Sequence, residues 1–273
     1  MYYDLVPARS KVGEGDGVEQ AVEYKGRVWV AALLYLAAIA GAELMTAVAH
    51  PIAGVILHIM LVIGLVIHAS LTAVPQHRNL YLTLALAPLI RVLSLSVPLV
   101  EFSQIYWYAI IAVPLLIAAF TVVAMLRYRL DEVGLTFKRL RLQLLVATSG
   151  IPFGVAEYYI LRPEPLVAGL SWGMVLLPAL ILLVGTGFVE EFIFRGVMQR
   201  SAGQAMGRWG WVYVAVMFAV LHTGYLLILD IVFVFVVGLF FAWIVIRTRS
   251  LLGVTLAHGI TNILLYLVIP FVL

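Results

Sequence analysis

Residues 231–246 read IVFVFVVGLFFAWIVI, a run of sixteen residues without one charged side chain. Extended back to residue 226, the apolar stretch contains a single charge, Asp230. A helix needs about 20 predominantly apolar residues to cross the hydrocarbon core of a bilayer. This stretch therefore predicts a transmembrane helix. It sets the fold class, because runs of the same kind occupy most of the remaining sequence.

The composition of the whole chain agrees with this prediction. Of the 273 residues, 64% are apolar and 11% are charged, and the mean hydropathy is +1.10. Soluble domains are about 45–50% apolar and about 25% charged. The composition excludes a soluble enzyme, a nucleic-acid-binding protein and a disordered chain. The chain has no cysteine, which excludes disulfides, thiol catalysis and Cys-ligated zinc.

Nine stretches are apolar enough to be predicted as spans, and the predicted fold is an all-α, polytopic transmembrane helix bundle. The seventh stretch is short, so eight full spans is the alternative. Residues 1–27 are predicted to form a polar cytosolic leader, and 28–273 a single transmembrane domain. The predicted spans are 28–49, 51–74, 80–99, 105–126, 142–161, 172–198, 209–223, 226–246 and 251–272.

The Lys and Arg residues outside these spans predict the orientation. Counted loop by loop, one side of the membrane holds 14 of them and the other side holds one. Cytoplasmic loops of membrane proteins carry an excess of Lys and Arg. The sequence therefore predicts a multi-pass integral membrane protein, in the cell membrane if the source is prokaryotic. It also predicts a cytosolic amino terminus and an odd number of crossings.

Charged residues inside spans are costly in lipid, so they are the first candidates for a functional site. The strongest group is EEFIFR at residues 190–195. Glu191 and Arg195 are four residues apart, share a helix face and can pair directly. Glu190 points about 100° away from Glu191 and lacks that partner. A surplus carboxylate inside the membrane predicts a chemical function for Glu190.

Two weaker patterns follow in later spans. Phe218 and His222 are four residues apart, and so are His258 and Asn262. Counted at about 1.5 Å per residue, Glu190, His222 and Asn262 lie roughly 12–20 Å from the cytosolic ends of their helices. These side chains are therefore predicted to meet in one cavity that opens toward the cytosol.

Such a set of side chains is sufficient to hydrolyse a peptide bond without a covalent nucleophile. A carboxylate assisted by an imidazole can activate water. A second histidine with an asparagine can donate hydrogen bonds to the oxyanion of the tetrahedral intermediate. The zinc protease pattern H-E-x-x-H is absent from the sequence.

The three patterns, in this order, resemble the CAAX protease and bacteriocin-processing family, also called the CPBP or Abi family. Its motifs are E-E-x-x-x-R, then F-x-x-x-H, then H-x-x-x-N or H-x-x-x-D. The resemblance covers about residues 172–265, the expected catalytic core, and the first five spans match none of its motifs. It implies a glutamate-type intramembrane endopeptidase like the Ras-converting type II CAAX prenyl protease.

The resemblance also implies a role for each residue. The implied catalytic residues are Glu190 and His222, which would activate water, and His258 and Asn262, which would form the oxyanion site. The residues implied to support the site are Glu191, Arg195 and Phe218. No cofactor is implied. The alternative is a zinc site at Glu190, His222 and His258, with water as the fourth ligand.

The predicted function is cleavage of a peptide bond near the cytosolic face, in CAAX-type or other membrane-associated substrates. The expected partners are a peptide or lipidated-protein substrate and membrane lipids, not nucleic acid, and the sequence does not define the oligomeric state. The alternative is a non-proteolytic scaffold or chaperone of the same fold. A proton-coupled transporter is disfavoured because the candidate residues cluster in one half of the bundle.

The other ionisable residues within spans are interpreted as structural. Arg91 is predicted to face the bundle interior and pair with an acid or with carbonyl groups. Glu43, Glu157 and Asp230 are predicted to reach water at the outer ends of their helices. His58 is predicted to be a packing residue.

Overall fold

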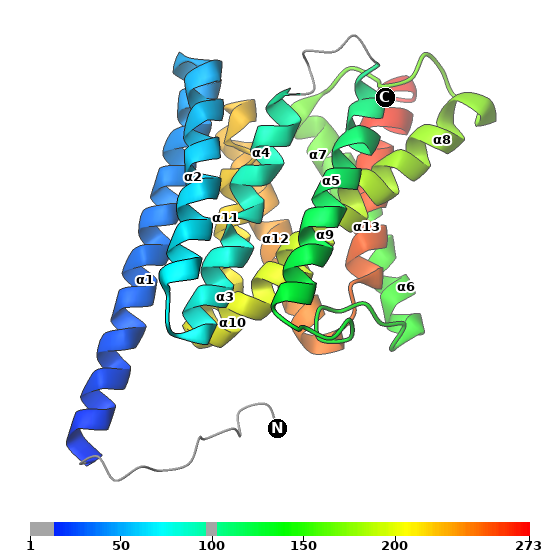
Figure 1. Ribbon diagram of the computed structural model, residues 1–273. Coiled ribbons are helices and arrows are strands. Elements are labelled where there is room, and N and C mark those ends of the chain that lie inside the picture. The colour runs from blue at the N-terminus through cyan, green and yellow to red at the C-terminus, as the bar shows by residue number, and fades with distance from the viewer. Residues whose placement is uncertain (1–13, 97–102) are drawn as a thin grey trace.

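A chain with so little charge must satisfy its backbone polar groups within helices when it lies in lipid. The computed structural model describes residues 14–96 and 103–273, and every regular element within these ranges is a helix (Figure 1). The predicted all-α bundle is confirmed. Residues 1–13 of the predicted leader and 97–99 of the third predicted span lie outside the described residues. Residues 14–25 continue the first helix.

The helices divide into an amino-terminal and a carboxyl-terminal set. The first set is α1 (Glu14–Leu44), η1 (Met45–Ala49), α2 (Pro51–Leu71), α3 (Pro75–Leu84), α4 (Leu86–Ser96), α5 (Gln104–Met125), α6 (Leu140–Thr148) and α7 (Gly150–Leu161). The second set begins with α8 (Trp172–Leu182), η3 (Leu183–Phe188), α9 (Val189–Glu191), η4 (Phe192–Met198) and α10 (Gln199–Met206). It ends with η5 (Gly207–Trp209), α11 (Gly210–Val220), η6 (Thr223–Tyr225), α12 (Ile228–Thr248), α13 (Leu252–Ile263), η7 (Leu264–Val268) and η8 (Ile269–Phe271).

Within the described residues, eight helical stretches are long and apolar enough to cross a membrane. One of them, Trp172–Tyr225, has 54 residues, which at about 1.5 Å per residue is far longer than a bilayer core of about 30 Å. This stretch turns at Gly207, whose φ of +67° suits glycine, and α11 then runs back along α12. The stretch therefore combines the sixth and seventh predicted spans, and the other predicted spans match the remaining stretches.

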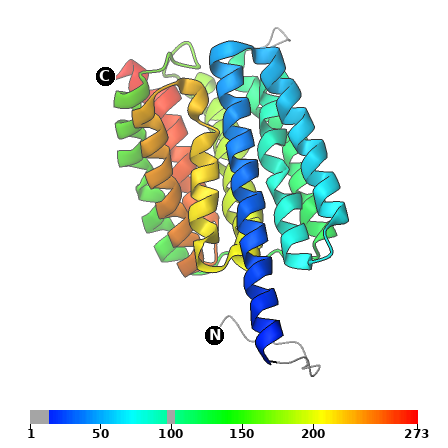
Figure 2. The same cartoon turned by 90° about the vertical axis from the view of Figure 1, so that its left-hand side faces the viewer.

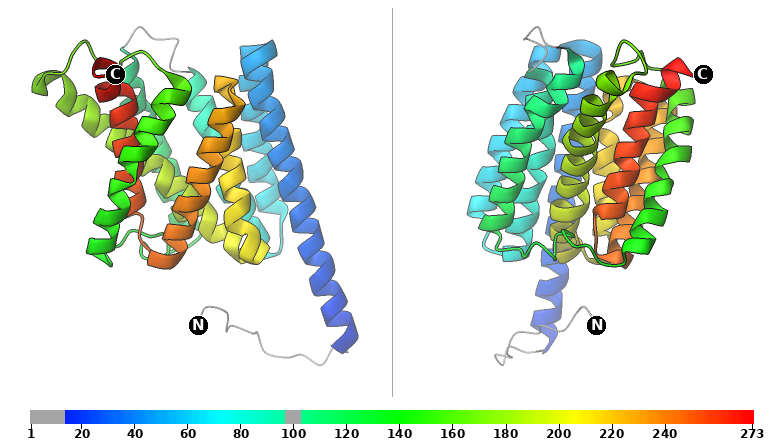
Figure 3. Two further views of the ribbon diagram at one scale, coloured as in Figure 1. Left: turned by 180° about the vertical axis from the view of Figure 1, so that it is seen from behind. Right: turned by 90° about the vertical axis from the view of Figure 1, so that its right-hand side faces the viewer.

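The two ends of the bundle differ in the parts of the chain that they carry (Figure 1). The first turns of α1 project beyond one end (Figure 2), which is the end where α3, α6 and α10 also lie (Figure 1). The other end carries the start of α8, the top of α12 and the carboxyl terminus (Figure 3). We call these the α1-start end and the carboxyl-terminal end. The described chain begins and ends at opposite ends of the bundle, as an odd number of passes requires.

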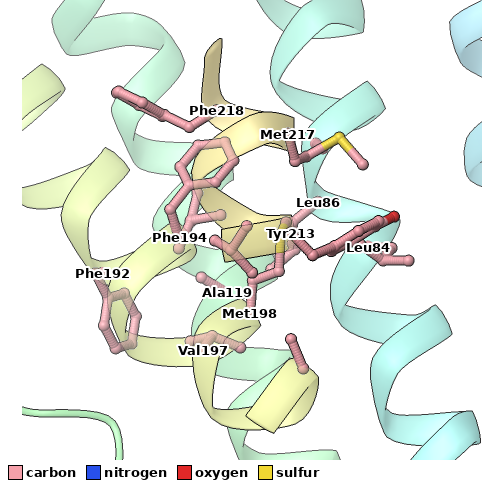
Figure 4. Close-up of a cluster of buried hydrophobic side chains, with 14 of the residues drawn as sticks. Leu84, Leu86, Ala119, Phe192, Phe194, Val197, Met198, Tyr213, Met217 and Phe218 are labelled. Carbon is pink, nitrogen blue, oxygen red and sulfur yellow. The ribbon is translucent and has the colours of Figure 1, made fainter. Parts of the chain in front are cut away.

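All residues of η4 are buried, and part of the hydrophobic core lies where this helix meets α11 and α3 (Figure 4). Phe192, Phe194 and Met198 are each at most 1% exposed. The ring of Phe194 stands edge-on to Phe218 of α11, with 5.0 Å between the ring centroids. This packing fixes the position of η4 relative to α11. It therefore also fixes the side chains at the ends of these two helices that point toward the start of α8 and the carboxyl terminus.

The amino-terminal helices contain a part-buried ion pair of their own. Arg91 Nε donates to Glu43 Oε1 over 2.6 Å, which confirms the predicted acid partner of Arg91. His58 Nε2 lies 3.2 Å from the same oxygen. The prediction that Glu43 and Asp230 reach interfacial water is wrong, because both side chains are fully buried. The prediction failed because helix ends near the membrane surface are still enclosed by neighbouring helices.

Candidate active site

Small residues allow two helices to cross closely at the centre of the site. A Cβ atom at Gly187 of η3 would lie 2.9 Å from the backbone nitrogen of Gly259 in α13, and 3.0 Å from the carbonyl oxygen of Thr255. A Cβ at Gly259 would collide with Leu183. Small residues at crossings of membrane helices allow such close backbone approach. The crossing brings the acidic motif on α9 against His258 on α13.

Glu191 is shared by two basic side chains. Arg195 Nη1 donates to its Oε1 over 3.0 Å, which confirms the predicted pairing along one helix face. His258 Nδ1 also lies 2.9 Å from this oxygen. The side chains of Glu191 and Arg195 are 0% and 1% exposed, so neither charge contacts water. A buried charge is tolerated only when it is paired, and Glu191 is therefore a fixed anchor of the site.

Phe218 supports the same pair from α11. The guanidinium carbon of Arg195 lies 4.1 Å from the centroid of the Phe218 ring, in cation–π geometry. Gly238 of α12 leaves the space on the other side, since a Cβ there would lie 3.1 Å from Arg195 Nη2. The ring of Phe218 also stands edge-on to His258, with 6.2 Å between centroids. Phe218 thus contacts both residues that bond Glu191.

Glu190 behaves differently from its neighbour. Its side chain is 27% exposed and lines a cavity. Its Oε2 lies 3.9 Å from His258 Nε2, which is too long for a hydrogen bond. The imidazole of His258 therefore lies between the two acids, with one ring nitrogen toward each. The expectation that Glu190 faces away from Arg195 is confirmed.

His222 follows the last turn of α11 and lines the same cavity. Its Nδ1 lies 2.9 Å from the carbonyl oxygen of Phe218. A carbonyl only accepts hydrogen bonds, so Nδ1 carries the proton and donates. The neutral ring then has a bare lone pair on Nε2. This tautomer is the one that a general base requires.

Asn262 is held by a residue that the sequence analysis did not identify. Its Nδ2 donates to Thr186 Oγ1 over 2.8 Å, and that hydroxyl donates to the carbonyl oxygen of Leu182 over 2.5 Å. These two linked hydrogen bonds fix the amide of Asn262 and leave its second Nδ2 hydrogen for another acceptor. Thr186 is four residues before Glu190, and this spacing was the available sign that both lie on one helix face.

The four residues implied as catalytic converge on one cavity of about 100 Å³, together with Phe218 and Thr186. This volume is sufficient for several water molecules. Further walls come from helices that carry no motif, including Tyr108 of α5 and Glu157 of α7. The predicted meeting of these side chains in one cavity matches the structure. Glu157, expected at interfacial water, is half-buried near the end of α7 and contributes a second carboxylate to the cavity lining.

The π-helical turns of η3 and η4 directly flank the acidic motif. Such turns are rare and occur frequently at functional sites, because they re-aim the side chains that follow. The three-residue α9 between them carries Glu190 and Glu191 in consecutive positions. The motif spacing alone does not predict these turns.

Among the described residues, no three His, Asp or Glu side chains are grouped to hold a metal ion. The three residues of the zinc alternative, Glu190, His222 and His258, do not form such a group. The bond of His258 Nδ1 to Glu191 leaves Nε2 toward the cavity, so this bond by itself does not distinguish the two alternatives.

Residues 171–264 match the model of one protein family, described as Type II CAAX prenyl endopeptidase Rce1-like. The matched range begins next to α8 and ends at the start of η7, so it contains all seven motif residues. It confirms the resemblance that the motifs predicted. Comparisons with curated proteins and with solved structures found no match.

Proposed function

On the basis of this family match, we propose that the protein is an intramembrane endopeptidase that hydrolyses a peptide bond with water activated by Glu190 and His222. The match supports a CAAX-type intramembrane protease. The observation that carries the proposal is the convergence of Glu190, His222, His258 and Asn262, from three separate segments, on one small cavity. A structural role alone would not place a surplus, partly exposed carboxylate there.

In the proposed first step, Glu190 or His222 Nε2 takes a proton from water while the water oxygen bonds to the carbonyl carbon of the substrate. The carbonyl π bond opens, and its oxygen takes the negative charge. The tetrahedral intermediate then collapses: the C–N bond breaks, and the nitrogen receives the proton held by the protein. The products are a carboxylic acid and an amine, and no redox change or co-reactant is needed.

The oxyanion would be bound by Asn262 and His258. The free Nδ2 hydrogen of Asn262 is one donor. His258 supplies a second when its ring carries both protons, with Nδ1 donating to Glu191 and Nε2 donating into the cavity. With His258 protonated, two acids (Glu190 and Glu191) face two cations (Arg195 and His258). The group is then electrically neutral, as the low dielectric of the interior favours.

The proposed substrate is a peptide segment attached to or inserted in the membrane, with a prenylated or otherwise lipidated peptide as the first class to test. The family match supports a prenylated peptide substrate. The cavity wall formed by α12 is apolar, with Phe233, Val234 and Val237 facing the site. Such a wall suits an apolar residue next to the scissile bond.

The test is hydrolysis of internally quenched peptides, with and without a prenylated cysteine, by purified protein in lipid nanodiscs. Glu190→Gln and His222→Ala should each lower kcat by about 10²–10⁴-fold, the usual loss when a general base is removed. The matched controls are Glu164→Gln and His77→Ala, which change the same residue types outside the cavity. Full cleavage by both site variants would overturn the assignment. A protein that never cleaves, but supports its cellular role with Glu190→Gln, would indicate the scaffold alternative.

A further inference from the structure

The ends of the bundle differ strongly in charge. Among the described residues outside the bundle interior, twelve Lys and Arg residues lie toward the α1-start end, in the first turns of α1 and around 78, 127–141, 200–208 and 247–249. Only Arg162 lies at the carboxyl-terminal end. Basic residues accumulate in the cytoplasmic loops of membrane proteins. The α1-start end is therefore assigned to the cytosol.

The cavity lies toward the opposite end. Tyr225 belongs to the η6 turn between α11 and α12, and Tyr266 belongs to η7, close to the carboxyl terminus. Tyr108 and Glu157 each lie four residues from the helix end at that side, in α5 and α7. Every one of these four residues lines the cavity. They extend the cavity from the catalytic residues toward the carboxyl-terminal end.

The path toward the α1-start end is closed by packing. Between Glu190 and α10, residues 191–199 are all buried. Phe192, Phe194 and Met198 fill this region (Figure 4). Arg195 is bonded to Glu191. By contrast, Tyr225 at the other end is 50% exposed. His222 lies about 18 Å from the start of α11, close to the predicted depth, but the lining continues away from the basic loops rather than toward them.

The η6 turn lies where the cavity opens at the carboxyl-terminal end, which we call the mouth. The residue types at this turn are typical of a membrane–water boundary. The hydroxyl groups of Tyr225 and Tyr266 lie 3.2 Å apart, and Leu226 and Ile228 beside them are 55% and 80% exposed. Tyrosine is enriched where the hydrocarbon core meets water. A polar aromatic pair beside exposed aliphatic residues fits the edge of a leaflet.

We propose that the catalytic cavity opens to the non-cytosolic side of the membrane, and that its substrates present the scissile bond on that side. That this cavity is catalytic rests on the proposed function, whereas the direction in which the cavity opens does not. It reverses the sequence-based expectation of a cavity open to the cytosol. The substrate class becomes a peptide segment at the outer leaflet, such as the juxtamembrane part of an exported or membrane-inserted protein.

The absence of cysteine from the sequence makes the test direct, because one introduced cysteine is the only thiol in the protein. Phe137→Cys and Trp172→Cys form a matched pair, since these aromatic residues are 84% and 87% exposed at opposite ends. Tyr225→Cys reports the mouth of the cavity, and Leu226→Cys repeats that measurement if the tyrosine variant misfolds. Each variant is labelled with a membrane-impermeant maleimide in intact bacterial cells and after lysis.

We expect Trp172→Cys and Tyr225→Cys to label in intact cells, and Phe137→Cys to label only after lysis. Labelling of Phe137→Cys in intact cells would overturn the orientation. Protection of both mouth variants in cells that label Trp172→Cys would overturn the opening of the cavity at that end. Labelling needs no catalysis, so a chain that labels as expected but cleaves no peptide would refute the proposed function alone.

Discussion

His258 Nδ1 lies 2.9 Å from the same Glu191 oxygen that accepts the bond from Arg195. One buried carboxylate therefore orients a histidine on another helix while it is itself neutralised within its own helix. The imidazole is left with its other nitrogen toward Glu190. Two consecutive acids thus differ in their tasks, and the same substitution at each should have different effects.

Glu191→Gln should abolish cleavage and also destabilise the fold. It leaves Arg195 buried and without its ion partner, and loss of one member of a buried pair costs about 3–5 kcal/mol. Thermal unfolding in detergent, followed by tryptophan fluorescence, should show a lower Tm. Glu190→Gln is the control: it should also lose activity but keep the Tm, because the partly exposed Glu190 neutralises no buried cation by hydrogen bonding. Equal shifts in Tm for both variants would contradict the division of roles.

Thr186→Val should reduce catalysis without unfolding the protein. The valine has nearly the shape of threonine but cannot accept the bond from Asn262 Nδ2, so the amide loses its fixed direction. Loss of one oxyanion donor costs about 10²–10³-fold in kcat, which sets the upper limit for this positioning residue. KM should stay near its original value, and Thr186→Ser should restore kcat. A Thr186→Val variant with unchanged kcat would show that Asn262 needs no such support.

Gly187→Ala should separate η3 from α13. The new methyl group would press on the backbone of α13 at Gly259, and overpacking of this kind costs about 1–3 kcal/mol. Cleavage should fall because the acids and His258 move apart. The control is Gly203→Ala in α10, where a Cβ meets nothing within 4 Å, so the variant should gain about 0.5–1 kcal/mol of helix stability. Wild-type Tm and activity for Gly187→Ala would show that this crossing tolerates a wider spacing.

Phe218→Leu should lower the Tm by removing the ring beneath Arg195. A desolvated cation–π contact contributes about 2 kcal/mol, and the edge contacts with Phe194 and His258 are lost with it. Phe137→Leu, at a ring that is 84% exposed, should leave the Tm unchanged. The comparison uses one chemical change in two environments. If both variants unfold at the wild-type temperature, Phe218 does not stabilise the buried pair.

Activity should persist after dialysis against a chelator of divalent ions. The proposed reaction uses only protein side chains and water, so no metal is expected to copurify in stoichiometric amount. Elemental analysis of the purified protein and cleavage assays with and without chelator measure this directly. One zinc per chain, together with activity that returns only when zinc is added back, would support the alternative site at Glu190, His222 and His258.

Local features of the site could be predicted from the sequence. The spans follow from apolar runs, and the pairing of Glu191 with Arg195 follows from a four-residue spacing on one helix. The grouping of three motifs followed from their order and depth. The spans and the ion pair could be predicted because each depends on the geometry of a single helix, and the grouping could be predicted because it depends only on the depth of each residue along its own helix.

Contacts between helices could not be predicted in the same way. The bond from His258 to Glu191 depends on how closely Gly187 and Gly259 allow two backbones to approach. The role of Thr186 depends on the approach of α13, which brings Asn262 within hydrogen-bond distance of its hydroxyl. The proposed direction of the cavity differs from the sequence-based expectation because depth was counted from one membrane surface only, and the short α11 places His222 beyond its last turn.

The pairing of Glu191 with Arg195 has a consequence for biosynthesis. Both residues lie on one continuous helical stretch, so their charges can neutralise each other as soon as that stretch enters the lipid, before any later helix exists. The contact of Glu190 with His258 and the second bond to Glu191 can form only after His258 has been synthesised, 67 residues later than Glu191. The nascent chain can therefore insert with this charge pair already neutralised, before its proposed catalytic residues have come together. The reactive arrangement is completed only when one of the last helices arrives.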